Sequence, residues 1–356
     1  MASPLSGVRS ALWRHTARFL HVTGLLTLAR PVLERTRVTT EGGLRAFPFV
    51  RPRRRTAAQI LIYHRVNDER DPYFGGVPVE VFRRQMEYLA ARYRVLRMSD
   101  LVRGLRAGSI PENAIAVTFD DGYRDNFEHA LPVLRATSVP ATIFLATSAI
   151  ESRRPLWHDD VFSAFRETRA PALATVGRTR IGGSLATVED RLRVQRAFLA
   201  YVRTLDDMER TNAILRLRDA LGVGPPRETP SLMLRWNEVQ AMHAAGIEFG
   251  SHTVTHPILS RMGRNQAHRE IAESKRVIEE RLGTPVEGFA YPNGSSADFT
   301  PETKELLQEA GYGYALTTVP GSNEPGCDLF ELRRTTPWDE DVFAFGLRLR
   351  YNKLCS

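Results

Sequence analysis

Short apolar runs alternate with segments of helical periodicity from residue 57 onward. Several of these runs are almost continuously apolar, which is typical of strands buried on both faces of a parallel sheet. The predicted strands are Gln59–Val66, Arg94–Met98, Ala114–Phe119, Ala141–Ala146, Ile247–His252, Glu287–Tyr291, Tyr314–Thr318 and Leu329–Arg334. The predicted helices are Val79–Tyr93, Asp100–Arg106, Asn126–Thr137, Asn237–Ala245, Gln266–Leu282 and Pro301–Ala310. This alternation predicts an α/β fold, a (β/α) barrel rather than an open sheet.

One segment, residues 151–235, interrupts the alternation. Its part Glu189–Ala220 interleaves charged residues with Leu, Val, Phe and Ile, which predicts one or two helices. Because the loops after barrel strands build the active site, we predict that this helical insertion forms a lid or a wall for substrate. The chain is therefore divided into a basic N-terminal segment (1–56), a barrel domain with the insertion (57–345) and a C-terminal tail (346–356).

The net charge of +8 is concentrated at the N-terminus. Residues 1–56 hold eleven arginines and two acidic residues; subtracting these from 49 basic and 41 acidic residues leaves 38 and 39 in the rest of the chain. A nucleic-acid-binding protein needs a basic patch on its fold, which a near-neutral body does not indicate. We therefore expect no nucleic-acid partner.

The apolar stretch Phe19–Ala29 is about half as long as a membrane-spanning helix. Its apolar positions recur at helical spacing, and Arg14 and Arg18 lie off that stripe, which fits an amphipathic helix on an anionic membrane surface. A helix packed on the catalytic domain, a disordered basic arm and a signal peptide are the alternatives. The sequence predicts no transmembrane helix. The amphipathic interpretation implies peripheral membrane contact through residues 1–35. A cytoplasmic or membrane-peripheral location is favoured over secretion, while the compartment itself stays open.

Two adjacent carboxylates follow the predicted strand Ala114–Phe119. In TFDDGY, Asp120 and Asp121 stand where the strand ends, and Gly122 allows the backbone to turn. Two negative charges this close are costly unless a cation lies beside them. One carboxylate can then bind a metal ion while the other accepts a proton from water. The structural alternative is a helix N-cap with an acid in the first turn.

A pair of histidines follows the predicted strand Ile247–His252. In HTVTHP, His252 and His256 are four residues apart, a spacing suited to one metal ion. With one acid they form a set of two histidines and one carboxylate, which leaves coordination positions open. A buried histidine pair held by hydrogen bonds is the alternative. A third cluster, Phe289–Gly294 (FAYPNG), is by itself explained as a strand that ends in a turn.

TFDDG, HTVTHP and a Tyr-Pro-x-Gly strand end, in this order, resemble the polysaccharide deacetylase family with the NodB homology domain, carbohydrate esterase family 4. The resemblance covers roughly residues 57–338 apart from the insertion. It implies a distorted (β/α)7 barrel and a hydrolase that removes N-acetyl groups from amino sugars, with Asp120 as general base. The implied ligands of one divalent metal ion, usually zinc and sometimes nickel, cobalt or manganese, are Asp121, His252 and His256.

The resemblance also implies residues that contact the substrate. Tyr291, Pro292 and Tyr123 are expected to line the groove, with a backbone N–H near Tyr291 or Asp121 as the oxyanion donor. The aromatic candidates for stacking on sugar rings, each of which fits the core equally well, are Tyr123, Trp157, Tyr291 and Trp338.

The sequence departs from the family pattern at two positions. Many members carry an arginine two residues before the proline of the third motif, where this chain has Ala290; Arg333 or Arg334 is the candidate replacement. Many members also carry a late histidine that acts as general acid, and residues 346–356 contain none. His64, in LIYHRV, resembles the early histidine of a circularly permuted branch, the poly-N-acetylglucosamine deacetylases, and is the predicted acid. A histidine satisfied at the barrel rim is the alternative.

Two other functions stay open at this point. The basic N-terminal segment favours a deacetylase of a lipid-linked sugar or small amide on the same barrel. The missing arginine of the third motif favours a catalytically inactive carbohydrate-binding protein, although the intact carboxylate and histidine pairs argue against it. The expected partner of the active enzyme is an N-acetylated glycan.

Overall fold

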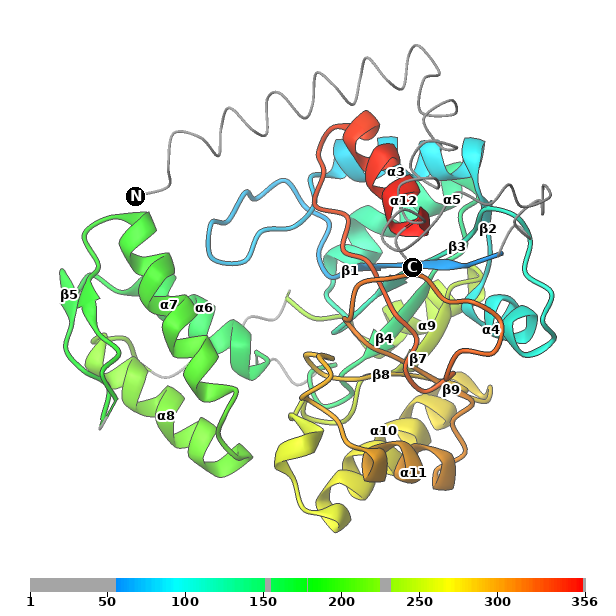
Figure 1. Ribbon diagram of the computed structural model, residues 1–356. Coiled ribbons are helices and arrows are strands. Elements are labelled where there is room, and N and C mark those ends of the chain that lie inside the picture. Colours follow the sequence, from blue (N-terminus) through cyan, green and yellow to red (C-terminus); the bar gives the residue numbers. More distant parts are fainter. Residues whose placement is uncertain (1–55, 151–154, 178, 225–231, 355–356) are drawn as a thin grey trace, which may run out of the picture.

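The computed structural model describes residues 56–150, 155–177, 179–224 and 232–354. The predictions for residues 1–35, and for nearly all of the basic segment 1–56, therefore lie outside the described residues. Within the described ranges, a curled parallel sheet carries helices on its outer side, so the predicted α/β barrel architecture is confirmed (Figure 1).

The main sheet has seven strands in the order β1-β3-β4-β7-β8-β9, and β2 pairs with β3. These strands are β1 (Gln59–Tyr63), β2 (Arg94–Val95), β3 (Ala114–Phe119), β4 (Thr142–Leu145), β7 (Glu248–Ser251), β8 (Gly288–Ala290) and β9 (Tyr314–Leu316). All pairings among them are parallel. Every residue of β1, β3, β4, β8 and β9 is buried, which explains why their sequences read as continuous apolar runs.

Residues 332–335, here called the closing segment, join the two edge strands of the sheet. Leu332 forms a parallel bridge with Leu316 of β9, and Thr335 forms one with Leu61 of β1. Backbone hydrogen bonds of 2.8 to 3.1 Å accompany both bridges. The region predicted as the strand Leu329–Arg334 therefore forms an isolated bridge instead of a regular strand. Together with Thr335, it closes the sheet into a barrel.

Helices cover the outside of the barrel. They are α3 (Val79–Arg92), α4 (Met98–Arg106), a π-helical turn η1 (Asn126–Ala130) that leads into α5 (Leu131–Thr137), α9 (Trp236–Ala244), a short η2 (Leu259–Arg261), α10 (Arg264–Leu282), α11 (Pro301–Glu309) and α12 (Val342–Leu354). In Figure 1, α3, α5 and α12 lie on one side of the sheet, and α10 and α11 lie on the other. Among the described residues, no helix combines the length and the apolar character that a membrane span needs.

The C-terminal tail predicted over residues 346–356 needs correction. The predicted boundary falls inside α12, which continues to Leu354. Phe345 and Leu349, four residues apart, are buried in the main core, and α12 packs against α3. The last described turns of the chain are therefore part of the barrel.

The alternating direction of side chains along the strands divides the core into two layers and determines which way the site residues point. Because successive strand residues point to opposite faces, Ile115 and Val117 of β3 join the large core beneath the helices. Ala114 and Ala116 join a smaller core, on the face toward the barrel interior. Thr118 continues the interior face, and the next position on that face is Asp120.

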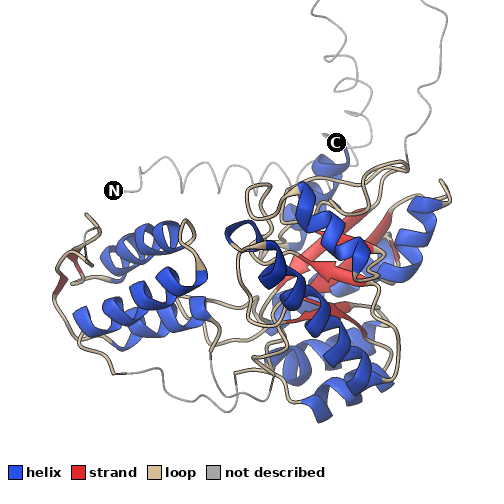
Figure 2. Cartoon of the chain, turned by 90° about the horizontal axis from the view of Figure 1, so that it is seen from below, coloured by secondary structure: helices blue, strands red, loops and turns tan. Residues whose placement is uncertain are grey.

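The insertion forms a lobe beside the barrel (Figures 1 and 2). It contains α6 (Trp157–Glu167), α7 (Val188–Val202), α8 (Asp207–Ala220) and an antiparallel pair, β5 (Ala172–Leu173) with β6 (Gly183–Ser184). The lobe has its own buried cluster, which includes Phe165, Phe198 and Leu217. The helices predicted over Glu189–Ala220 are confirmed as α7 and α8, whereas α6 was not predicted.

Candidate metal centre and active site

A left-handed turn at the end of β3 sends two adjacent carboxylates to different partners. Asp121 has φ of 77° and Gly122 has φ of 87°. A Cβ atom at Gly122 would lie 2.8 Å from Cδ2 of Leu145, so both the backbone and the space require glycine there. Asp120 consequently faces the closing segment, and Asp121 faces the loop after β7.

Asp120 is paired with Arg334 of the closing segment. The Nη1 and Nη2 atoms of Arg334 donate to Oδ1 and Oδ2 of Asp120, both at 2.7 Å, and Nε donates to the Thr317 carbonyl at 2.8 Å. Burial opposes the charge on Asp120, but the guanidinium outweighs it and holds the pKa of this carboxyl below its usual value. Of the two arginines predicted as candidates, Arg334 occupies this position, and Arg333 is exposed.

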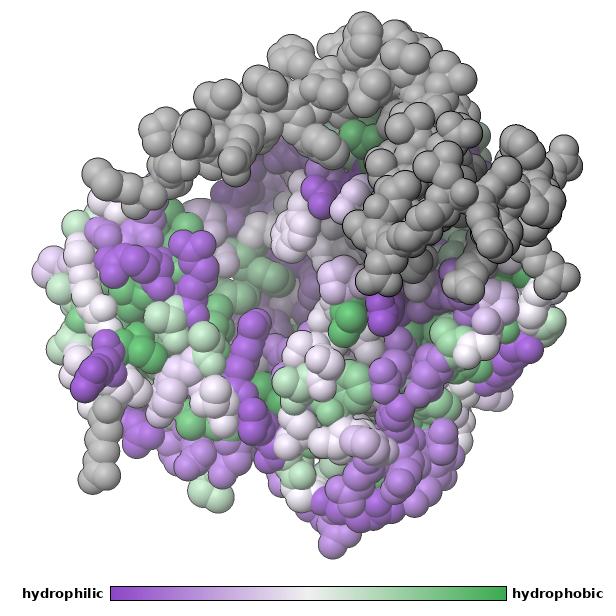
Figure 3. All heavy atoms as spheres, in the orientation of Figure 1, coloured by the Kyte–Doolittle hydropathy of each residue, from purple (hydrophilic) through white to green (hydrophobic). Residues whose placement is uncertain are grey.

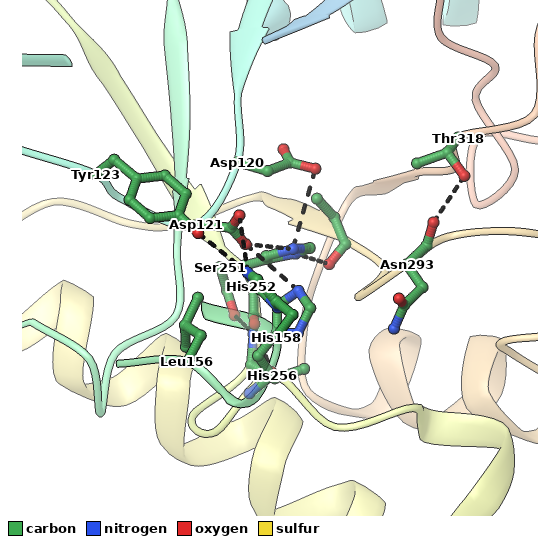
Figure 4. A network of polar contacts seen from close by, with 12 residues as sticks. Asp120, Asp121, Tyr123, Leu156, His158, Ser251, His252, His256, Asn293 and Thr318 are labelled. Carbon is green, nitrogen blue, oxygen red and sulfur yellow. Dashed lines mark hydrogen bonds and ion pairs between the residues drawn. The ribbon is translucent and has the colours of Figure 1, made fainter. Parts of the chain in front are cut away.

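Asp121, His252 and His256 converge on the other side of the turn (Figure 4). Oδ1 of Asp121 lies 3.4 Å from Nε2 of His252 and 3.4 Å from Nε2 of His256. This oxygen is buried and has no hydrogen-bond partner in the described part of the chain. One ligand atom from each of the three residues lies within 4.8 Å of the others. An unpartnered carboxylate oxygen that faces two imidazole nitrogens fits a divalent cation.

Hydrogen bonds set the orientation of the two histidines. Nδ1 of His252 lies 2.7 Å from the Ala290 carbonyl, which can only accept, so Nδ1 carries the proton and Nε2 presents its lone pair to the site. His256 has φ of 58°, and its N–H donates to Oγ1 of Thr253 at 3.0 Å. Burial holds the pKa of His256 well below its usual value, which favours the neutral imidazole that metal binding requires.

The charges at the site favour a bound cation. Burial opposes ionisation of Asp121, yet the imidazoles of His252 and His256 keep the pKa of this carboxyl below its usual value. Burial lowers the pKa of His252, but Asp120 and Asp121 outweigh that effect and raise it above the usual value. Two ionised, buried carboxylates therefore face the imidazoles of His252 and His256, and Asp120 is paired with Arg334 as well.

His64 lies directly after β1, at the same end of the barrel. Burial lowers the pKa of its imidazole, while the charges of Asp121 and Asp120 oppose the shift, so His64 lies within their electrostatic reach. Its carbonyl accepts a hydrogen bond from Nδ2 of Asn126 at 2.9 Å. The structure thus brings His64 to the end of the barrel that carries the predicted base and metal ligands.

The predicted substrate contacts of Tyr291 and Pro292 need correction. The ring of Tyr291 stacks on Phe299 with centroids 4.2 Å apart, and its hydroxyl donates to the Phe330 carbonyl at 3.0 Å. Its backbone N–H donates to the Leu316 carbonyl at 3.0 Å, so it serves the sheet and not an oxyanion. Pro292 is buried as well. Tyr291 and Pro292 of the third motif are therefore core residues that support the site from within the fold.

His158, in α6 of the insertion, is a site residue that the sequence did not reveal. Its Nε2 lies 3.0 Å from the Tyr123 hydroxyl and 3.8 Å from Oδ2 of Asp121. The same hydroxyl donates to Oδ1 of Asp159 at 2.9 Å. Tyr123, predicted to contact substrate, is therefore fully buried and bonded within the protein. No strand end precedes His158 and no second histidine follows at ligand spacing, so no sequence signal marked it.

A parallel barrel with a carboxylate and two imidazoles at the carboxyl end of its strands is an arrangement that can bind a metal ion, as metal-dependent hydrolases do. The family model for polysaccharide deacetylases matches residues 107–315, more than half of the chain. The chain belongs to the polysaccharide deacetylase family. The predicted family is therefore confirmed.

Individual relatives agree with this assignment. YxkH of Bacillus subtilis (strain 168), named for the same family, is 21% identical over 277 residues, which cover 77% of this chain and 69% of that protein. The poly-beta-1,6-N-acetyl-D-glucosamine N-deacetylase of Escherichia coli (strain K12) is 33% identical over 84 residues, which cover 23% of this chain and only 12% of that protein.

Two solved structures share the fold. IcaB from Ammonifex degensii has a TM-score of 0.54 and 20% identity, covering 84% of this chain and 97% of that chain. The Streptococcus pyogenes deacetylase PplD in complex with acetate has a TM-score of 0.53 and 18% identity, covering 79% and 92%. At these identities the likeness concerns the fold.

Proposed function

We propose that this chain is a metal-dependent hydrolase that removes N-acetyl groups from the amino sugars of a polysaccharide or glycan. The observation that carries the proposal is the buried, unpartnered Oδ1 of Asp121, 3.4 Å from the Nε2 atoms of His252 and His256. Membership in the polysaccharide deacetylase family supports it. The Escherichia coli relative is named for an N-acetylated glucosamine polymer, which supports the substrate class chosen here.

The three convergent side chains, Asp121, His252 and His256, would hold one divalent ion. We assign zinc because two imidazoles and one carboxylate form a common zinc ligand set. When bound, the ion would polarise the acetyl carbonyl and lower the pKa of a water molecule.

Asp120 is the proposed general base. Arg334 keeps its carboxylate ionised and fixes its plane through two hydrogen bonds of 2.7 Å, so an oxygen is ready to take the proton of the attacking water. His64 is the proposed general acid for the leaving amine, because it lies at the same end of the barrel as Asp120 and Asp121, whose charges favour its protonated form against the effect of burial. Since the N–H of Tyr291 is used in the sheet, the N–H of Asp121 is the remaining candidate to stabilise the oxyanion.

The insertion is the proposed wall of the substrate site. In Figure 3 the surface is hollowed between the insertion lobe and the barrel. His158 of α6 reaches the Asp121 carboxylate from that lobe. A glycan that enters along this hollow would pass between the two parts of the molecule.

Acetate release and zinc content, measured together, test the proposal. Wild type, Asp120→Asn and the exposed control Asp219→Asn are incubated with β-1,6- and β-1,4-linked N-acetylglucosamine oligomers. Asp120→Asn should keep its zinc and lose about 10²- to 10⁴-fold in rate, the usual contribution of a general base, while Asp219→Asn should match wild type. Zinc binding without acetate release from any sugar would contradict the substrate class and favour a carbohydrate-binding protein.

We also propose that residues 1–35 contact an anionic membrane surface. The apolar stripe of Phe19–Ala29 and the flanking Arg14 and Arg18 support this interpretation. Sedimentation of the full chain with phosphatidylserine vesicles tests it, since Arg14→Gln with Arg18→Gln should weaken binding by about 2 kcal/mol, at about 1 kcal/mol per basic residue near the surface. Equal binding to neutral phosphatidylcholine vesicles would contradict it.

A further inference from the structure

We propose that Trp157 and His158, adjacent in α6 of the insertion, are the outer shell of the metal centre. They act as positioning residues for the ligands His256 and Asp121, so the insertion determines how tightly the ion is held. This inference rests on the metal site of the proposed function, but not on the identity of the substrate.

His256 takes part of its support from the insertion. A metal-binding histidine usually donates its second ring N–H to a carbonyl or carboxylate. His252 does so to Ala290, whereas Nδ1 of His256 is buried with no hydrogen-bond partner in the described ranges. Instead, Nε1 of Trp157 donates to the His256 carbonyl at 2.9 Å and holds the left-handed backbone of this residue, φ of 58°. The His158 ring packs edge-on against the His256 ring, with centroids 4.9 Å apart.

Asp121 is contacted by the insertion on its second oxygen. Oδ1 faces the two histidine ligands, while Oδ2 lies 3.8 Å from Nε2 of His158. The Tyr123 hydroxyl has one proton and donates it to Asp159, so in the 3.0 Å contact between Tyr123 and His158 the donor is Nε2–H of the histidine. The proton-bearing edge of His158 is therefore beside the Asp121 carboxylate. Because its Nε2 carries a proton, His158 does not bind the ion through that atom and acts instead on the ligand Asp121.

The core of the insertion fixes α6 in this place. The guanidinium of Arg210, from α8, stacks over the Trp157 ring at 5.0 Å from its centroid. Arg218, also from α8, donates to Oδ1 of Asp160 at 2.5 Å and to Oγ of Ser163 at 3.1 Å. Two arginines of one helix thus hold the start of α6, and the position of the metal ligands depends on a lobe outside the barrel.

Zinc affinity of the full chain, measured without substrate by competition with a chromophoric chelator, tests the inference. His158→Phe keeps the ring and removes the N–H; Trp157→Phe removes the indole donor. Each should weaken zinc binding about 10- to 100-fold, the usual effect of an outer-shell loss. His158→Gln places an amide N–H in the same region and should recover most of the loss. The matched controls, the exposed Trp338→Phe and His268→Gln, should bind zinc like wild type.

Wild-type affinity in both His158→Phe and Trp157→Phe would overturn the inference. A loss in His158→Gln equal to that in His158→Phe would also overturn it, because an N–H donor in this region would then not restore zinc binding. A wild-type chain that binds no zinc would overturn the inference and the proposed function together. A chain that binds zinc but releases no acetate would overturn only the deacetylase, because the affinity comparison needs no substrate.

Discussion

At the scale of single residues, the cation that faces Asp120 inside the barrel is Arg334, whose side chain has 0% exposure. Arg334→Met should lower the free energy of unfolding of the zinc-free protein by about 3–5 kcal/mol, because it leaves a buried carboxylate without its partner. Urea unfolding measures the change. The neighbouring Arg333→Met, on an exposed side chain, should change stability by no more than about 0.5 kcal/mol. Equal losses in the two variants would contradict the assignment.

Asp125 holds the turn that carries His64. Its Oδ2 accepts hydrogen bonds from Arg65 at 2.9 Å and Asn67 at 2.8 Å, and its Oδ1 accepts one from the Val66 N–H at 3.3 Å. Asp125→Ala should lower kcat for acetate release about 10- to 100-fold, because a small misplacement of a catalytic group costs about that much. KM and zinc content should change little, since these hydrogen bonds of Asp125 run to residues 65–67 and not to the metal ligands.

Asn126→Ala is the milder companion variant, because it removes one hydrogen bond, from Nδ2 of Asn126 to the His64 carbonyl at 2.9 Å. Its loss in kcat should be smaller than that of Asp125→Ala. Steady-state kinetics on the N-acetylglucosamine oligomers, with zinc measured on the same samples, separates the two effects. Loss of zinc in parallel with loss of rate would show that Asp125 supports the metal site instead of the acid.

The residues that the sequence could reveal are those at strand ends. Asp120, Asp121 and the histidine pair stand directly after apolar runs, so their spacing and position predicted a shared site. Arg334 could not be separated from Arg333, because the closing segment has too little regular structure to show which side faces inward. His158 could not be found, because its contacts run to Tyr123, 35 residues away, and depend on how the insertion packs.

At the scale of elements, close contact between strands β4 and β7 requires glycine at position 250. A Cβ atom there would lie 2.4 Å from Cε1 of Phe144 and 2.9 Å from the Gly288 carbonyl oxygen. Gly250→Ala should therefore lower the free energy of unfolding by about 1–3 kcal/mol through overpacking. Gly224→Ala, where a Cβ meets no atom of the described residues within 4 Å, is the matched control and should stay within about 0.5 kcal/mol in the same urea experiment.

The elements that escaped prediction are those set by tertiary contacts. The run LRLRY near the C-terminus alternates apolar and basic residues, yet it lies in helix α12 because Phe345 and Leu349 share the face that packs on the core. The closing segment reads as a strand in sequence, but only single bridges join it to β9 and β1. In both places packing overrides the local pattern, whereas β3 and β4 were predicted closely because burial on both faces selects apolar residues throughout.

At the scale of the whole molecule, metal binding should be coupled to folding. Asp121 follows β3, while His252 and His256 follow β7, and only the folded barrel brings the three within 4.8 Å. Zinc at about 100 times its Kd should therefore raise the free energy of unfolding by about 2.7 kcal/mol. Urea unfolding with zinc and with a chelator measures the difference.

The increase in stability on zinc binding can also test the different roles proposed for the two adjacent aspartates, Asp120 and Asp121. Asp121→Asn should remove most of the stabilisation by zinc, because its carboxylate is a ligand. Asp120→Asn should keep it, because both oxygens of that carboxylate are bonded to Arg334 at 2.7 Å, and its contact with Nε2 of His252 is longer, at 4.0 Å. If zinc stabilises Asp121→Asn as strongly as wild type, the ion is held elsewhere. If instead Asp120→Asn loses the effect, the two carboxylates share the ion, and the division between base and ligand proposed here is wrong.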